Sequence, residues 1–221
     1  MEPIEFTDYL TYIQPKDEEH LEVLRTYALE HDIPIIKREM KQFMETLLVM
    51  NRPLKVLEIG TAMGYSSLMM VQTMLSYAQE AAIAIHTLER SDEMFELATK
   101  NILDNQKEHL IHIHHGEAEE TLHRMVQEGL RFDLVFMDAA KGQYLTFLPM
   151  CMELLNVRGL LVSDNVLQGG DVVKSRYSVS RRQRTIHQRM RQYLWELNHR
   201  DDLKTSILSI ADGATLSVKL F

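Results

Sequence analysis

The chain has 221 residues, 45% of them hydrophobic, which suffices for one α/β domain with a sizeable core and is cramped for two. A formal net charge of −8 argues against general affinity for nucleic acids. The single cysteine excludes an intrachain disulfide and fits a reducing cytoplasm, and no apolar run approaches the roughly 20 residues needed to cross a bilayer. The first residues show no basic region followed by an apolar core, so we expect a cytoplasmic protein without a membrane partner.

Residues 1–53 are predicted to be helical and contain no obvious active-site motif. Lys16 to Glu30 has the composition of a charged helix, and a second helix is expected to begin at Pro34. The apolar residues of this second helix recur at helical spacings and form one stripe: Ile36, Met40, Phe43, Met44 and Leu47. We expect the stripe to pack on the edge of a sheet or on a second subunit.

From Leu54 onward, short apolar runs alternate with helical patterns, which is typical of a parallel sheet with crossover helices. The predicted strands are 54–60, 82–88, 110–115, 132–137 and 158–165. The predicted helices are 65–79, 92–105, 116–129 and 143–155. Two further β-runs, 205–210 and 214–220, are joined by a tight turn and predict a final antiparallel hairpin.

The first predicted strand runs into a turn with Gly60 and Gly64, which permit tight bends and a close approach of the backbone to a ligand. This spacing differs from the G-x-G-x-x-G dinucleotide fingerprint, so an NAD-linked oxidoreductase is disfavoured. Glu89 ends the second strand, where an acidic side chain can accept hydrogen bonds from both hydroxyls of a ribose. Alternatively, Glu89 and Asp92 only open the next helix.

Side-chain oxygens also follow two later strands. Asp138 ends the apolar run at 132–137, Lys141 lies three residues further on, and Asp164 and Asn165 end the fifth strand. Ligands of open α/β sheets bind at the carboxyl ends of the strands, so Asp138 and Lys141 form a candidate chemical pair. The alternative is an aspartate that caps a helix, followed by a solvated lysine. A set of oxygen donors favours a hard cation such as Mg²⁺ over zinc.

A basic segment follows the fifth strand. Residues 172–191 contain seven Lys and Arg and no acid, whereas the other residues carry 17 of the 24 basic and all 32 acidic side chains. The basic side chains are either solvated decoration or contacts for phosphates: Lys174, Arg176, Arg181, Arg182, Arg184, Arg189 and Arg191. Within a predicted helix, Arg181, Arg184 and Arg191 share one face. The opposite face is apolar: Ile186, Met190, Tyr193, Leu194 and Leu197.

Three motifs carry a resemblance that runs essentially from end to end: Leu57-Glu-Ile-Gly-Thr-Ala-Met-Gly-Tyr-Ser66, Met137-Asp-Ala-Ala-Lys-Gly-Gln-Tyr144 and Ser163-Asp-Asn-Val-Leu167. They resemble the metal-dependent class I O-methyltransferases related to catechol and caffeoyl-CoA enzymes. The resemblance implies a Rossmann-like fold with a seven-stranded, mostly parallel sheet, a C-terminal antiparallel hairpin and extra N-terminal helices. It also implies one domain, with 1–53 as a helical extension and 54–221 as the catalytic core.

Within this family, the motif from Lys141 to Tyr144, the run from Ser163 to Leu167 and the Arg-rich segment are most similar to bacterial tRNA 5-hydroxyuridine methyltransferases. Those enzymes make 5-methoxyuridine at the wobble position of tRNA. The resemblance thus implies a tRNA partner for the basic segment. The alternative acceptors are small catechols or phenols, on which relatives with similar motifs act. A silent binding module on the same fold is disfavoured because the metal-ligand positions and the lysine are both present.

The resemblance assigns roles residue by residue. S-adenosylmethionine is expected to contact Glu58, Gly60, Gly64, Tyr65 and Ser66 through its amino acid end, Glu89 through its ribose, Glu117 and Ala118 through its adenine, and Asp138. Many relatives have Asp where this chain has Glu117. Mg²⁺ is expected on Asp138, Asp164 and Asn165, with Lys141 as the base and Asp138 beside it. Family likeness and the apolar N-terminal stripe also suggest a homodimer.

Overall fold

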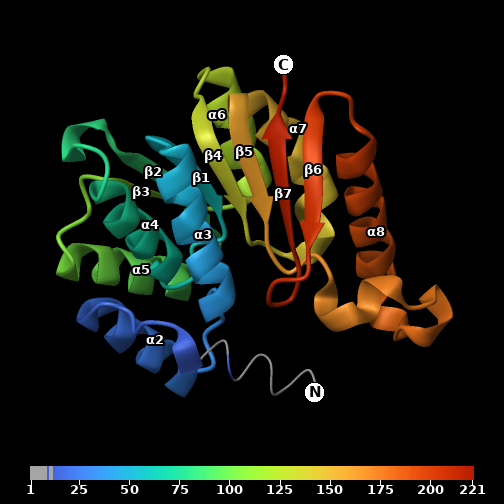
Figure 1. Cartoon of the computed structure of the whole chain (residues 1–221), viewed down its shortest axis with the longest axis horizontal. Coiled ribbons are helices and arrows are strands. Elements are labelled where there is room, and N and C mark those ends of the chain that lie inside the picture. The colour runs from blue at the N-terminus through green and yellow to red at the C-terminus, as the bar shows by residue number, and fades with distance from the viewer. Residues whose placement is uncertain (1–8, 10–11) are drawn as a thin grey trace.

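The computed structural model describes residue 9 and residues 12–221, so the start of the predicted N-terminal extension lies outside the described residues. In this part of the chain, seven strands form one sheet in the order β3-β2-β1-β4-β5-β7-β6 (Figure 1). The strands are β1 (Lys55–Ile59), β2 (Ala84–Glu89), β3 (Ile111–His115), β4 (Phe132–Met137), β5 (Leu155–Ser163), β6 (Leu203–Leu208) and β7 (Ala214–Lys219). β1 to β5 pair in parallel, and β7 lies antiparallel between β5 and β6, which confirms the predicted sheet and its hairpin.

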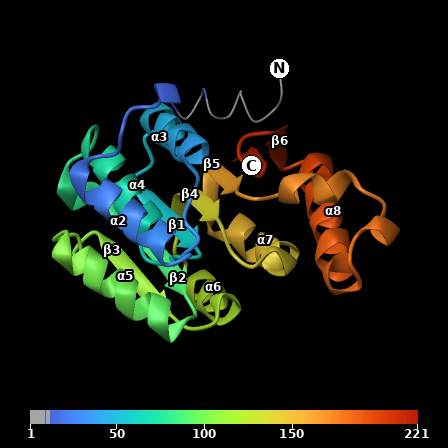
Figure 2. The ribbon, with the colours of Figure 1, turned by 90° about the horizontal axis from the view of Figure 1, so that it is seen from below.

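Helices cover both faces of the sheet, as Figure 2 shows from below. They are α2 (Glu19–Glu30), α3 (Arg38–Asn51), α4 (Tyr65–Leu75), α5 (Asp92–Asp104), α6 (Ala118–Gln127), α7 (Tyr144–Leu154) and α8 (Arg184–His199). Helices α2, α3, α4 and α5 share one core cluster with one face of the sheet. Helices α6, α7 and α8 share a second core cluster with the other face. No helix among the described residues has the length and apolar character needed to span a membrane.

The central strand β4 shows why its sequence folds this way. Leu134 and Phe136 are buried in the cluster of the α3 and α4 side, whereas Val135 and Met137 are buried in the cluster of the α7 side. Successive side chains of a strand point to opposite faces, so a continuous apolar run serves two cores at once. Asp138 is then the first polar residue after the strand, at the edge where the site lies.

The N-terminal stripe packs within its own chain. Met40, Met44 and Leu47 are buried in the same cluster as residues of α4, and Phe43 packs against that cluster. The stripe therefore packs on helix α4, which is neither of the two predicted partners. It supplies no support for a second subunit, and the homodimer stays a prediction.

Two predicted boundaries are wrong in ways that matter for the site. The second N-terminal helix begins at Arg38 and not at Pro34, because Lys37 still has an extended backbone with φ −67° and ψ 156°. Helix α8 begins at Arg184. Arg181 lies before it in a separate 3₁₀ turn (Arg181–Gln183), so it does not share a helical face with Arg191.

Candidate active site

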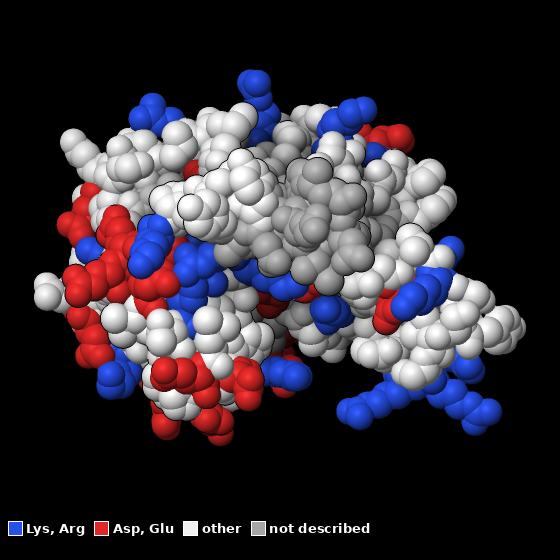
Figure 3. All heavy atoms as spheres, turned by 60° about the horizontal axis from the view of Figure 1, so that its bottom comes forward, with Lys and Arg blue, Asp and Glu red and all other residues white. Residues whose placement is uncertain are grey.

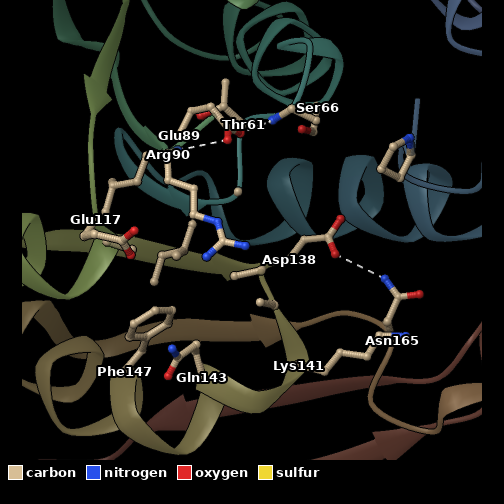
Figure 4. Close-up of a pocket in the computed structure, with 18 of the residues that line it drawn as sticks. Thr61, Ser66, Glu89, Arg90, Glu117, Asp138, Lys141, Gln143, Phe147 and Asn165 are labelled. Atoms are coloured by element: carbon tan, nitrogen blue, oxygen red, sulfur yellow. Dashed lines mark hydrogen bonds between the residues drawn. The ribbon is translucent and has the colours of Figure 1, made fainter. Parts of the chain in front are cut away.

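A cavity of about 430 Å³ opens at the carboxyl ends of β1, β2 and β4 (Figure 4). Most of the predicted cofactor residues line it: Gly60, Tyr65, Ser66, Glu89, Glu117, Ala118 and Asp138. Lys141 and Asn165 line it as well. Three of the other predicted residues, Glu58, Gly64 and Asp164, do not line the cavity but lie behind its wall. The predicted residues thus converge on one edge of the sheet, as expected for parallel strands.

Gly60 allows the ends of β1 and β4 to meet at the floor of the cavity. Its φ of +107° favours glycine, and a Cβ at this position would lie 2.0 Å from the backbone oxygen of Asp138. Gly64 has φ +83° immediately before α4, and a Cβ there would contact the side chains of Ala98 and Ile102. The first glycine permits the close approach of two strands, and the second permits the turn into the helix and its packing on α5.

Glu58 supports the turn from below. Its side chain is fully buried, and it accepts hydrogen bonds from the hydroxyls of Ser67 and Thr87, the latter at 2.6 Å. Burial raises the pKa of Glu58 to about 7. The other carboxyl oxygen, Oε1, has no hydrogen-bond partner within the part of the chain that the structure describes. An unpaired buried acceptor is costly, so this oxygen is open to a donor, which a bound ligand or a water molecule could supply.

The hydroxyl of Tyr65 is used inside the fold. It donates to Asp17 Oδ2 at 2.5 Å and accepts from Arg25 Nη2 at 2.6 Å, and Arg25 Nε also donates to Asp17 at 3.0 Å. Only the ring and backbone of Tyr65 are therefore available at the cavity wall, because its hydroxyl fastens α2 to α4. Ser66 faces the cavity (Figure 4).

Glu89 is held rigidly at the end of β2. Its Oε2 accepts from the backbone N–H of Ala62 at 2.8 Å, and its Oε1 accepts from those of Arg90 and Ser91 at 2.9 and 2.8 Å. A carboxylate oxygen can accept more than one hydrogen bond, so both oxygens can still receive ribose hydroxyls. The two predicted roles of Glu89, ribose contact and helix start, are compatible, since its side chain both contacts the start of α5 and lines the cavity.

Two carboxylates and one amide lie side by side next to Lys141. Asn165 Nδ2 donates to Asp138 Oδ1 at 3.1 Å, and the backbone N–H of Asn165 donates to Asp164 Oδ1 at 2.7 Å. Burial raises the pKa of Asp138. Burial and the neighbouring Asp138 raise the pKa of Asp164 to about 7. The charges of these two buried carboxylates repel one another, and a cation bound between them would remove that cost.

The donor set fits a hard divalent cation. It consists of two carboxylates and an amide, and a rotation of the Asn165 amide would turn its Oδ1 towards Asp138. Among the described residues, no group of three His, Cys, Asp or Glu side chains is placed to hold a metal ion. The candidate site depends on the amide as its third donor.

Lys141 stands on a short 3₁₀ turn (Lys141–Gln143) between β4 and α7. Its neighbour Gly142 accepts a hydrogen bond from Arg189 Nη1 of α8 at 2.9 Å. The buried hydroxyl of Tyr144 lies 3.2 Å from the backbone oxygen of Met137 and 2.9 Å from that of Asp164. These contacts join the turn that carries Lys141 to α8 on one side and to the two acidic strand ends on the other.

Several cavity residues were not predicted from the sequence. The side chain of Arg90 extends from the end of β2 into the cavity (Figure 4), where Gln143 and Phe147 also lie. Pro34, Ile35 and Ile36 form a wall from the linker between α2 and α3. Gln143 stands within a recognised motif, but the others follow from the course of the backbone alone.

The seven basic side chains lie on the segment between β5 and α8 and on the first half of α8. In Figure 3, Lys and Arg side chains project at the lower right, on the side where α8 lies in Figure 1. Four of the seven bond to this chain's own oxygens: Lys174 to Asp171, Arg184 to Val179, Arg189 to Gly142 and Arg191 to Val172. The other three, Arg176, Arg181 and Arg182, are exposed and make no hydrogen bond or ion pair with the described residues.

Comparison with known proteins identifies the family. The model of a family described as O-methyltransferase matches residues 12–220. The chain belongs to the O-methyltransferase family. This O-methyltransferase is 28% identical over 215 residues to caffeoyl-CoA O-methyltransferase 2 of Populus trichocarpa. The matched region covers 93% of this chain and 84% of the relative.

Solved structures agree with the fold. A candidate caffeoyl-CoA O-methyltransferase from Staphylococcus aureus aligns with a TM-score of 0.84 and 30% identity over 97% of this O-methyltransferase and 98% of that chain. The O-methyltransferase TomG from Streptomyces achromogenes, solved with S-adenosylmethionine, aligns with a TM-score of 0.82 over 96% of this chain and 95% of that chain. At 24% identity, the second comparison establishes the fold only.

Proposed function

We propose that this protein transfers a methyl group from S-adenosylmethionine to the 5-hydroxyl of 5-hydroxyuridine at the wobble position of tRNA, with the help of Mg²⁺. The observation that carries the proposal is one cavity that joins the glycine turn and Glu89 to Asp138, Lys141 and Asn165. A donor pocket and a set of metal-ligand and base candidates thereby share one space. The binding of S-adenosylmethionine by TomG supports the choice of donor.

The proposal gives the cofactor one direction in the cavity. Its amino acid end would lie on the turn at Gly60 and Ser66, its ribose hydroxyls on Glu89, and its adenine beside Glu117 and Ala118. The sulfonium methyl group would then lie near Asp138, at the edge that also holds Lys141. Methyl transfer is an in-line displacement, so holding the two reactants aligned lowers much of its barrier.

The chain's own residues supply a route for the proton. The acceptor hydroxyl must lose its proton, and Lys141, which lines the cavity, would take it when neutral. As the acceptor oxygen bonds to the methyl carbon, the bond from carbon to sulfur breaks, and S-adenosylhomocysteine leaves. A divalent ion held by Asp138, Asp164 and Asn165 would supply a Lewis acid that favours the deprotonated acceptor and fixes its oxygen.

The basic segment supports an RNA acceptor. It contains seven cations and no acid in a chain with a net charge of −8, so its potential is opposite to that of the whole protein. The hydrogen bond from Arg189 to Gly142 places the segment next to the turn that carries Lys141. Phosphate contacts are expected mainly from Arg176, Arg181 and Arg182, whose guanidinium groups make no hydrogen bond or ion pair with residues 12–221.

We further propose that residues 1–221 form a single domain that acts as a homodimer in the cytoplasm. The packing of α2 and α3 into the same core cluster as α4 supports the single domain. Light scattering of the purified protein would test the dimer, and a mass of one chain would contradict it.

The decisive experiment uses tRNA that carries 5-hydroxyuridine at the wobble position, with S-adenosylmethionine and Mg²⁺, and detects 5-methoxyuridine by nucleoside mass spectrometry. Turnover should stop in a chelator and in Asp138→Asn, while calorimetry still detects binding of the methyl donor. Asp92→Asn is the matched control, since that side chain is 90% exposed. Unchanged turnover in the chelator would exclude a role of the metal ion in the reaction. If the unaltered protein did not bind the methyl donor, the proposed methyltransferase activity would be excluded.

A small catechol or phenol is the second candidate acceptor. The similarity to caffeoyl-CoA O-methyltransferase 2 of Populus trichocarpa favours it, and the same side chains would serve. Turnover on a simple catechol without turnover on tRNA would establish this alternative. In cells that lack the protein, loss of 5-methoxyuridine with accumulation of 5-hydroxyuridine would establish the tRNA substrate.

A further inference from the structure

The segment between β5 and α8 presents one aromatic ring to solvent. Tyr177 is 85% exposed, on a short 3₁₀ turn (Arg176–Ser178). Val172 and Val179 are buried on either side of it, and all residues from 173 to 178 are exposed. The buried residues fasten this segment to the protein at both ends, and the segment lies at the lower right of Figure 1.

One arginine lies over the ring, and three others are close to it in the sequence. The Cζ atom of Arg184 lies 6.0 Å from the centre of the Tyr177 ring, and Arg184 Nε is held by the backbone oxygen of Val179 at 3.3 Å. Arg176 is its neighbour in sequence, and Arg181 and Arg182 lie on the next turn. The guanidinium groups of these last three make no bond with the described residues. An open aromatic ring is therefore set among arginines that are available to an anionic partner.

A nucleobase is the partner that fits both features. Unpaired bases of RNA loops stack on aromatic side chains, while arginines contact the adjoining phosphates. A protein partner would require a broader apolar surface, whereas the exposed residues around Tyr177 are mostly Lys, Ser and Arg, with Val173 as the apolar exception. Double-stranded RNA offers the phosphates without free base faces, so it would not use the ring.

We propose that Tyr177 is a stacking site for an unpaired base of the RNA loop that this protein modifies, with Arg176, Arg181 and Arg182 on the neighbouring phosphates. This inference rests on the proposed tRNA function and adds a second base contact outside the active-site cavity. The base in the cavity is the one that reacts, and the base on Tyr177 sets how the loop is held.

The test compares binding of an anticodon stem-loop RNA with binding of a duplex RNA of the same length, by fluorescence anisotropy over a series of salt concentrations. Tyr177→Ala should weaken stem-loop binding by about 5- to 150-fold, as expected for the loss of one stacked base. It should leave duplex binding and the salt dependence unchanged, and Tyr177→Phe should restore affinity to within about threefold. Arg182→Gln should instead weaken the binding of both RNAs and lower the slope of log affinity against log salt concentration by about one.

Trp195→Ala is the matched control, because Trp195 is an exposed aromatic residue of α8, 62% exposed, outside the basic segment. It should bind the stem-loop normally. Equal stem-loop affinity of Tyr177→Ala and the unaltered protein would overturn the stacking site and leave the tRNA function standing. Failure of the unaltered protein to bind or methylate the tRNA would overturn both. A loss of dimer in Tyr177→Ala would assign the ring to a second copy of the chain and overturn the proposal.

Discussion

Replacement of Glu58 by Gln should change how the stability of the protein depends on pH. The buried carboxyl of Glu58 has its pKa raised from an ordinary value near 4.5 to about 7. The folded state therefore binds this proton more tightly than the unfolded state. The resulting contribution to stability is complete below the unfolded pKa, falls as pH rises between the two values, and is lost above the folded pKa.

The magnitude follows from the two pKa values. Between pH 5 and pH 8, the linkage amounts to about 2.5 kcal/mol of unfolding free energy. The neutral amide of Glu58→Gln does not titrate, so the variant should gain about that amount relative to the unaltered protein over this range. The hydroxyls of Ser67 and Thr87 can still donate to the amide oxygen, which keeps the exchange conservative.

Urea denaturation at pH 5, 6, 7 and 8 would measure the difference, without methyl donor or metal present. Glu120→Gln, at an exposed glutamate of α6, is the control and should keep the pH dependence of the unaltered protein. A difference between Glu58→Gln and the unaltered protein that stays constant with pH would refute the reasoning, because the carboxyl would then be equally ionised in both states.

Other variants test the turn, the link to α8 and the N-terminal contact. Gly60→Ala places a methyl group against the backbone of Asp138 and should lower the unfolding free energy by more than about 3 kcal/mol, as measured by denaturation; a native-like value would contradict the tight contact. Arg189→Ala should lower kcat on any acceptor by about tenfold with little change in KM, because it frees the turn that carries the candidate base. Arg182→Ala should mainly raise KM for tRNA. Equal effects of the two substitutions on kcat and KM would contradict this distinction. Tyr65→Phe leaves a buried ion pair without its hydroxyl and should cost about 1–3 kcal/mol by thermal unfolding; an unchanged melting temperature would show that the hydroxyl is dispensable.

The sheet and the convergence of the acidic strand ends could be predicted because they follow from local rules. The run before Asp138 is apolar at every position except Asp133, which indicates a strand buried on both faces. Parallel strands place Asp138 and Asn165 at the same edge of the sheet. In the structure, Asn165 Nδ2 lies 3.1 Å from Asp138 Oδ1. No knowledge of the loops was needed for that conclusion.

The position of Glu58 relative to the cavity could not be predicted in the same way. Its place in a recognised motif indicates a cofactor contact, but only the path of α4 over β1 decides that its carboxyl faces Ser67 and Thr87. The roles of the arginines have the same limit. A count of charges does not separate Arg189, which bonds to Gly142, from Arg182, because the distinction depends on how α8 packs.

The linker between α2 and α3 has a consequence for any attempt to shorten the protein. Pro34, Ile35 and Ile36 form one wall of the cavity, and the side chain of Arg25 lies within 3.4 Å of the backbone oxygen of Ile36. A fragment that starts at Leu54 would keep every strand and every acidic ligand candidate, yet the cavity proposed to hold the methyl donor would be open to water on one side. The helical extension is therefore part of the wall that encloses the candidate active site.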